Sequence, residues 1–312
     1  MDIQEPRKAV KSGIIATAVM SIIGTMAPLI PAAVLLVYLA AVLFFTCAKR
    51  YGFIFTLPFL IAAYVFVAFG TSFITALADI LAPGLAALVM GELMRLNREQ
   101  SEVILKGILA GALCNLASVA ALKLTEEISL LSQLRANVEQ IISTGVSSGE
   151  LTIHAAQSLE KAYEVMLQMV PALLVVTIML GTVFVYFAGC AIMRKTGEEM
   201  YKFLPFKEFT FSKSIIIGGL LILVLSYILG AVGVISSDVL LLNVCLTLAA
   251  MFSLQGLAVL TFIFSIVRIP RILLFILVLM LVLSMMGILV LFFTGIVDLA
   301  MDLRKRLKAK RG

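Results

Sequence analysis

Apolar residues run along this chain in stretches much longer than one helical turn, and short charged clusters separate them. The first stretch, residues 13–46, carries no charge, and Pro28 and Pro31 interrupt helical hydrogen bonding near its middle. Because ~20 apolar residues cross the ~30 Å of hydrocarbon in a bilayer, this stretch predicts two membrane helices joined by a tight turn. The next stretch, residues 53–93, predicts a third and a fourth helix with a turn at residues 70–72.

Two more helices and one polar region complete the N-terminal part of the chain. A fifth helix is predicted at residues 103–122, and a sixth from Val170 to about Met193. Between them lies an extended polar region, residues 123–168, in which apolar residues recur at helical spacing on both sides of a Ser-Ser-Gly break. We expect this region to form a helical hairpin that lies on the membrane.

The C-terminal part holds further apolar runs, and the chain as a whole is predicted to be an all-α polytopic membrane protein with about eight or nine transmembrane segments. Residues 1–193 are expected to form a six-helix bundle, followed by a basic loop at 194–213. Transmembrane helices are expected within 214–303, and a basic tail at 304–312. The three apolar runs of this part are 215–235, 239–267 and 272–301.

Composition agrees with this class and excludes a soluble globular protein. Hydrophobic residues make up 62% of the chain and charged residues 13%, whereas soluble domains have about 45–50% and 25%. The net charge of +6 comes from the tail, so it favours a topology signal or an anionic lipid contact over nucleic acid. The four cysteines are isolated and His154 is the sole histidine, so no metal or other cofactor is expected.

Charge also predicts the orientation of the chain. With the N-terminus in the cytoplasm, six crossings place the basic clusters near Lys49, Arg95 and Arg194 inside and the acidic hairpin outside. Three further crossings would then export the basic tail, which the same rule opposes. Either a C-terminal run is re-entrant or only partly inserted, the alternative that we favour, or residues 13–46 cross only once.

Polar side chains inside the apolar runs are the candidates for a binding site. Asp79 lies about two turns inside the predicted outer end of the fourth helix, where a charge is costly without a partner or water. Asn115 and Tyr64 reach a comparable depth, and with Thr71 and Ser72 they predict a small polar pocket open to the outside. The alternative is structural: an aspartate can reach the headgroups, and an asparagine can join two helices.

Small residues form a ridge along the first helix, at Ala9, Gly13, Thr17, Ser21 and Thr25. Such a ridge lets two membrane helices approach closely. It predicts a docking surface, either for a neighbouring helix of the same chain or for a separate subunit.

The C-terminal runs carry polar residues for which we expect structural roles. Asn243 and Gln255 share one face of a helix and predict interhelical hydrogen bonds. Asp298, Asp302 and Arg306 are spaced four apart and predict an ion-paired stripe at the end of a helix. No motif of a catalytic nucleophile, a nucleotide-binding loop or a metalloprotease occurs, so no catalytic residue is predicted and no enzyme is expected.

Three stretches resemble the YybS family of bacterial multi-pass membrane proteins, in that family's order: FLPFKEFTFSKS, LLNVCLTLAAMFSLQGLAVLTFIF and GIVDLAMDLRKRL. The N-terminal six helices of that family are similar to the S components of energy-coupling-factor transporters, the subunits that bind the substrate. This resemblance implies a bacterial cell-membrane protein. It also implies that Ala9, Gly13 and Thr17 dock a coupling subunit, although an alanine pair is more usual there.

The resemblance thus implies that the chain binds a small nutrient from outside, with ATPases and a coupling subunit supplied by other chains. The bilayer is then its constant partner, and an unknown small molecule is its ligand. The alternative is a membrane scaffold or regulator that transports nothing and binds other proteins through the ridge, the GIVDLAMDLRKR segment and the hairpin.

Overall fold

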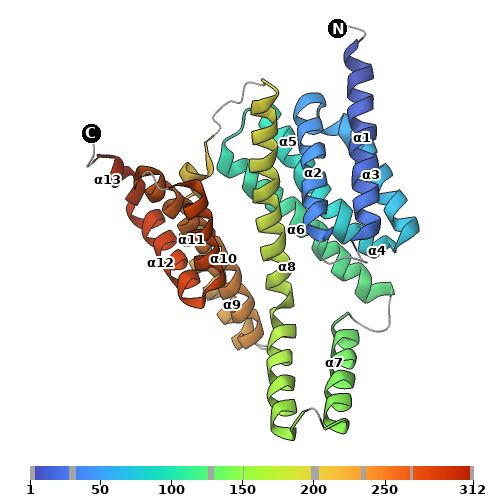
Figure 1. Cartoon of the computed structure of the whole chain (residues 1–312), viewed down its shortest axis with the longest axis vertical. Helices are drawn as coiled ribbons and strands as arrows, with labels where there is room; N and C mark the ends of the chain where they lie inside the picture. Colours follow the sequence, from blue (N-terminus) through green and yellow to red (C-terminus); the bar gives the residue numbers. More distant parts are fainter. Residues whose placement is uncertain are drawn as a thin grey trace.

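The computed structural model describes residues 4–27, 33–125, 130–149, 151–197, 204–232, 237–267 and 270–309. Within these ranges every regular element is helical (Figure 1). The elements are α1 Gln4–Met26, α2 Ala33–Tyr51, α3 Phe53–Gly70, α4 Phe73–Ala76, η1 Leu77–Leu81, α5 Ala82–Arg95, α6 Gln100–Thr125, α7 Leu130–Ser147, α8 Ile153–Lys195, η2 Phe206–Glu208, α9 Ser214–Ala231, α10 Ser237–Val267, α11 Arg271–Leu283, α12 Met285–Met301 and α13 Leu303–Ala309.

The predicted class is confirmed: the described chain is an all-helical, polytopic membrane protein. Seven of its helices are long and apolar enough to cross a membrane, or eight if the bent pair α11–α12 counts as one span. The predicted number of eight or nine is therefore met at its lower end. Many apolar side chains of the protein also face outward, as on α9, where Ile217 is 72% and Leu221 68% exposed. Such an outward apolar surface suits contact with lipid.

The N-terminal helices pack around α2, which contacts α1, α5 and α8. Small residues permit the close approach. The ring of Phe45 lies against Gly189 of α8, and the backbone of Phe45 lies against Gly91 of α5. The predicted division of residues 13–46 into two helices is confirmed by α1 and α2. The turn between them, with Pro28 and Pro31, lies outside the described residues.

The hairpin differs from its prediction. Its second arm is not separate from the sixth membrane helix, because α8 is one continuous helix of 43 residues. At 1.5 Å per residue it is about 65 Å long, roughly twice the hydrocarbon thickness. The predicted start of that helix at Val170 is therefore wrong. The hairpin also does not lie flat: α7 packs beside the first half of α8, and both project from the bundle along its axis (Figure 1).

An asparagine explains how α8 continues through Pro171. The Ala172 amide donates to Asn243 Oδ1 (2.8 Å), and Asn243 Nδ2 donates to the Gln168 carbonyl (2.7 Å). In an uninterrupted helix that amide and that carbonyl would bond to each other. The side chain of Asn243 is thus inserted into the hydrogen-bond ladder of α8, and the interhelical role predicted for it is confirmed.

Replacing Asn243 by leucine should loosen α8 at this point. The amide of Ala172 and the carbonyl of Gln168 lose their partners, at about 1–3 kcal/mol for each group left unsatisfied. Hydrogen exchange in detergent should show faster exchange of the Ala172 amide, with a lower unfolding temperature. Thr247→Val is the control, because the Thr247 hydroxyl bonds only one turn back along α10. Equal exchange in both variants would refute this role.

The tail lies at the same end of the molecule as the basic loop, as one of our two alternatives required. Helices α11 and α12 are bent by 101° relative to each other. Residues from the start of α9 (Lys213), the last turns of α10 (Phe262) and the end of α12 (Asp302) line one pocket. The chain therefore leaves this end through α11 and returns to it through α12, a course that agrees with a re-entrant run. Residues 13–46 form two helices, α1 and α2, and the number of times that they cross the membrane stays a prediction.

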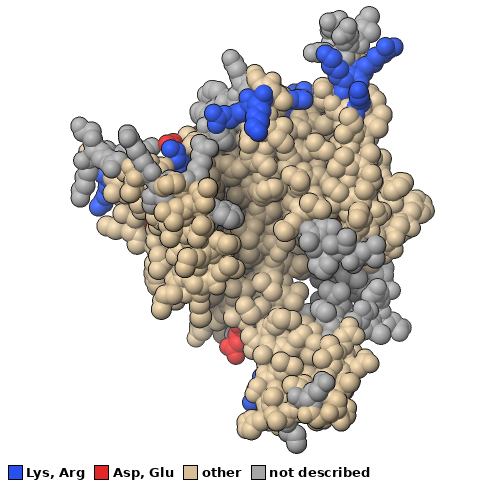
Figure 2. Space-filling model, viewed as in Figure 1, with Lys and Arg blue, Asp and Glu red and all other residues tan. Residues whose placement is uncertain are grey.

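Basic side chains gather at this end. Arg50 at the end of α2 donates to Thr196 at the end of α8 (3.1 Å), and Glu92 at the end of α5 accepts from the Phe53 amide (2.9 Å). The face shown in Figure 2 carries its Lys and Arg side chains mainly at this end. This agrees with the orientation that the positive-inside rule predicts, with this end in the cytoplasm and the hairpin outside, and the orientation itself stays a prediction.

Candidate functional site

Asp79 lies in a π-helical turn, η1, between α4 and α5. The cause is Pro83, which has no amide hydrogen and cannot bond to the Asp79 carbonyl as an α-helix requires. The chain instead widens by one residue, and the Ala82 amide donates to the Leu77 carbonyl. Such turns occur mostly within α-helices and often at functional sites. This one places a half-buried carboxylate inside an apolar span, Phe73–Arg95.

Helix α6 brings Asn115 to the same segment. The Cys114 thiol lies 3.7 Å from the Leu77 carbonyl oxygen. A Cβ on Gly111 would lie 3.5 Å from the Ala82 carbonyl oxygen and 2.9 Å from Ile178 of α8. The face of α6 that carries these residues therefore packs along η1. Asn115, one turn after Gly111 on that face, lies beside the segment that holds Asp79.

Tyr38 completes this group from α2. Its ring lies against the backbone of Gly181 in α8, and α2 itself contacts η1, the turn that holds Asp79. Only 9% of Tyr38 is exposed. We call Tyr38, Asp79 and Asn115 the Asp79 site. Sequence reasoning missed Tyr38, since a tyrosine in an apolar run gives no sign of the face that it occupies.

Two polar side chains of the Asp79 site, Asp79 and Asn115, have hydrogen-bonding groups that no described residue satisfies. The Asn115 Oδ1 atom is buried and has no hydrogen-bond partner in the described parts of the chain. Nor does Asp79 form a hydrogen bond or ion pair with any residue that the structure describes. Burying such groups without partners costs free energy, so they are expected to meet water or a ligand.

The other predicted pocket residues are engaged in local hydrogen bonds. The Tyr64 hydroxyl donates to the Phe73 carbonyl (3.3 Å), and the Thr71 hydroxyl donates to the Val67 carbonyl (2.9 Å). Ser72 is the N-cap of α4 and accepts from the Thr75 amide (3.1 Å). The structure thus gathers these three residues at the turn between α3 and α4. None of these hydrogen bonds reaches the Asp79 site.

The small-residue ridge of α1 faces another helix of the same chain. A Cβ on Gly13 would lie 2.7 Å from the ring of Phe59 in α3, and the Thr17 hydroxyl donates to the Phe59 carbonyl (3.0 Å). Ala9, one turn before Gly13, is 5% exposed. The first of the two alternatives for the ridge, packing within the chain, is therefore the one observed.

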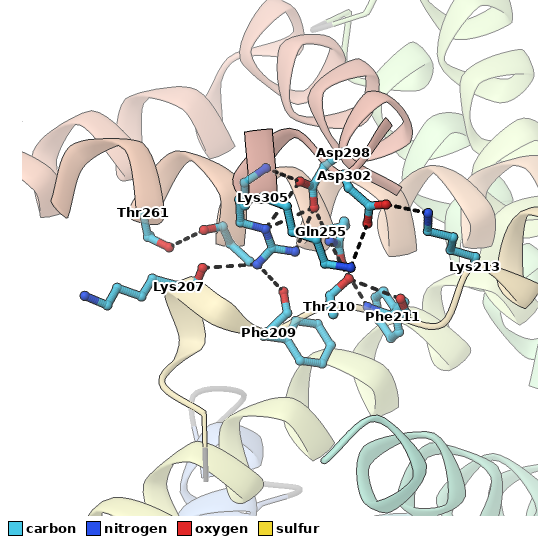
Figure 3. A network of polar contacts seen from close by, with 12 residues as sticks. Lys207, Phe209, Thr210, Phe211, Lys213, Gln255, Thr261, Asp298, Asp302 and Lys305 are labelled. Carbon is cyan, nitrogen blue, oxygen red and sulfur yellow. Dashed lines mark hydrogen bonds and ion pairs between the residues drawn. The ribbon is translucent and has the colours of Figure 1, made fainter. Parts of the chain in front are cut away.

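A second polar cluster lies at the basic end, around Asp298 (Figure 3). Asp298 is 3% exposed and accepts from Gln255 Nε2 (2.7 Å) and from Arg304 Nη2 (2.7 Å). Gln255 is fully buried and accepts from the Phe211 amide (3.0 Å). The Arg304 guanidinium also donates to the carbonyls of Lys207 (3.1 Å) and Phe209 (2.7 Å). We call Asp298, Gln255 and Arg304 the Asp298 cluster.

The Asp298 cluster fastens loop 204–213 and the tail to α10 and α12. Its side chains come from the second and third of the three stretches that carry the family resemblance, and they bind the backbone of the first at Lys207, Phe209 and Phe211. None of the buried nitrogen and oxygen atoms of its three side chains lacks a hydrogen-bond partner among the described residues. This arrangement supports a structural role. The hydrogen bonds that were predicted for Gln255 are confirmed.

The predicted stripe of Asp298, Asp302 and Arg306 is wrong. The helix ends at Asp302, which has a left-handed backbone with φ 52°. This break turns the chain so that Arg304 pairs with Asp298. Asp302 instead accepts from Lys213 (2.6 Å), and this hydrogen bond holds the pKa of the Asp302 carboxyl below its usual range. A sequence spacing of four predicts a shared face only while the helix continues.

Metal chemistry finds no support in the described ranges, which contain no group of three or more histidine, cysteine, aspartate or glutamate residues placed to hold an ion. The described cysteines are free thiols. The sequence-based expectation of no cofactor and no catalytic residue stays a prediction.

The fold and these clusters define a polytopic helical membrane protein in which Asp79, inside one span, has no hydrogen-bond or ion-pair partner among the described residues. Comparison with known families is consistent with this class: the model of a family described as predicted membrane protein (DUF2232) matches residues 15–299. The chain belongs to this family. No curated protein and no solved structure matches it. The finer resemblance, to the YybS family and to S components, stays a prediction.

Proposed function

We propose that this protein is a substrate-binding subunit in the bacterial cell membrane that takes up a small nutrient from outside. The observation that carries the proposal is Asp79, a half-buried carboxylate in a π-helical turn of a membrane span, with no partner among the described residues. Ionisable residues at such positions are rare, because they are costly, and commonly mark substrate or ion pathways. Energy would come from separate ATPase and coupling subunits, as the resemblance to S components implies.

The position of the Asp79 site supports capture from outside. It lies one to two turns from the turn between α3 and α4, at the end of the bundle away from the basic clusters. Helices α2, α3 and α6 contact η1, the turn that holds Asp79. Because α3 covers Gly13 and Thr17, and Ala9 is buried, no coupling subunit is proposed on that ridge.

Asp79→Asn should weaken ligand binding while the protein still inserts and folds. The amide keeps the size of the side chain but removes its charge, and a hydrogen bond to a charged group is worth about 1.5–3 kcal/mol, a loss of tenfold or more in affinity. Small molecules that co-purify with the protein in mild detergent should be identified by mass spectrometry for both forms. Asp238→Asn is the matched control, since Asp238 is exposed at the start of α10.

The same purification tests the partners. A pair of ATPases and a membrane subunit should co-elute in fixed proportion with the wild-type protein. Equal ligand content in wild type and Asp79→Asn would refute the assignment of the Asp79 site. The absence of ATPases would refute the transport function.

A scaffold or regulator is the second candidate, and the hairpin favours it. Helix α7 and the first half of α8 project beyond the bundle (Figure 1). A protein partner that is lost when residues 130–152 are deleted, with no small molecule bound, would support this candidate over transport.

A further inference from the structure

We propose that the ligand of the Asp79 site is a small organic cation that carries a protonated amine. This inference rests on the binding function proposed above and adds the chemical class of the ligand. Two observations support it: Asp79 has no positively charged partner among the described residues, and the unpaired groups of the site are hydrogen-bond acceptors.

The charge argument begins with Asp79. A carboxylate removed from water needs a counter-charge, and no lysine or arginine among the described residues pairs with it. The basic side chains near the ends of α2, α5 and α8 lie at the opposite end of the bundle, where Figure 2 shows most of the Lys and Arg side chains of the visible face. A positively charged ligand would supply the missing counter-charge, whereas an anion would be repelled.

Hydrogen bonding points to the same class. A carboxylate only accepts hydrogen bonds, and the buried Asn115 Oδ1 atom, without a partner, is also an acceptor. An ammonium group has three donors and no acceptor. Tyr38 stands on α2, a helix that contacts η1, and its aromatic ring can attract a cation as well. A protonated amine therefore complements all three side chains of the Asp79 site.

Charged thiol reagents test this class directly, because the reagents themselves carry the positive or negative charge. The full-length protein, with its four native cysteines replaced by alanine, would carry Asn115→Cys. Reaction rates would be measured with methanethiosulfonate ethyltrimethylammonium, a cation, and methanethiosulfonate ethylsulfonate, an anion. The cation should react faster, and Asp79→Asn should lower the ratio of the two rates on the order of tenfold, because the attracting charge is gone. Asp238→Asn should leave the ratio unchanged.

The outcomes separate this inference from the proposed function. If both reagents react equally and Asp79→Asn changes nothing, the site is open but the class of ligand is wrong. If neither reagent reaches Asn115→Cys, the site is closed to water, and both the binding function and its ligand class are overturned.

A measurement on the native sequence guards against misfolding of the cysteine variant. Putrescine, 1,4-butanediol and succinate have similar lengths and are cationic, neutral and anionic. Only putrescine should raise the unfolding temperature of the wild-type protein, and Asp79→Asn should abolish that rise. A rise with succinate or butanediol that depends on Asp79 would contradict the cationic class and keep the binding function. No rise with putrescine would also contradict the cationic class.

Discussion

Asp298→Ala is expected to destabilise the C-terminal helices by about 3–5 kcal/mol, the usual cost of breaking a buried ion pair. The substitution leaves the Arg304 guanidinium, 11% exposed, without its counter-charge and removes an acceptor of Gln255. Loop 204–213 should loosen along with the tail, because Arg304 and Gln255 both bind the backbone of that loop. Unfolding by a denaturing detergent, followed by proteolysis at the loop, would measure both effects.

Two variants make this test specific. Asp302→Ala removes a nearby ion pair whose side chains are 36% and 61% exposed, and exposed pairs contribute little. The double variant Asp298→Leu with Arg304→Met removes both buried charges and should recover much of the loss. If Asp298→Ala behaved like Asp302→Ala, the Asp298 cluster would not hold the loop and the tail in place.

Gly256→Val should separate α10 from α12 at a cost of about 3 kcal/mol, the upper part of the usual range for overpacking. A Cβ on Gly256 would overlap the carbonyl oxygen of Leu291, and one on Gly295 would overlap the carbonyl oxygen of Phe252. These neighbours are backbone atoms, so they cannot move without shifting a whole helix. The unfolding transition in detergent should fall, and the Gln255 to Asp298 hydrogen bond should weaken.

Gly218→Val on α9 is the matched control. It places the same side chain on a membrane helix, but nothing lies within 4 Å of a Cβ at Gly218. It should change stability little. Equal effects at Gly218 and Gly256 would show that the loss reflects a general intolerance of valine and not the contact between α10 and α12.

Much of the fold could be predicted from the sequence because lipid imposes simple rules on length and charge. The two helices in residues 13–46, the turn before Ser72 and the end of α5 at Arg95 follow from apolar length and from charge. The course of α8 could not be predicted, since Pro171 normally ends a helix. Here Asn243, distant in sequence, repairs the ladder, and only the packed structure reveals this.

The candidate site was partly predictable for a similar reason. Asp79 stands out because charge is rare in an apolar run, and Asn115 because an amide there needs a partner. The π-helical turn was not foreseen, although Pro83 in the same run was its signal. Tyr64, Thr71 and Ser72 were grouped by depth alone, and depth does not distinguish a side chain that binds its own turn from one that faces a site.

Everything proposed about capture from outside depends on the two ends of the molecule facing opposite sides of the membrane. His154 lies near the start of α8, and Ala309 ends α13 near the basic loop. In intact cells a membrane-impermeant maleimide should label His154→Cys but should label Ala309→Cys only after permeabilisation. Labelling of Ala309→Cys in intact cells, or protection of His154→Cys there, would contradict the arrangement.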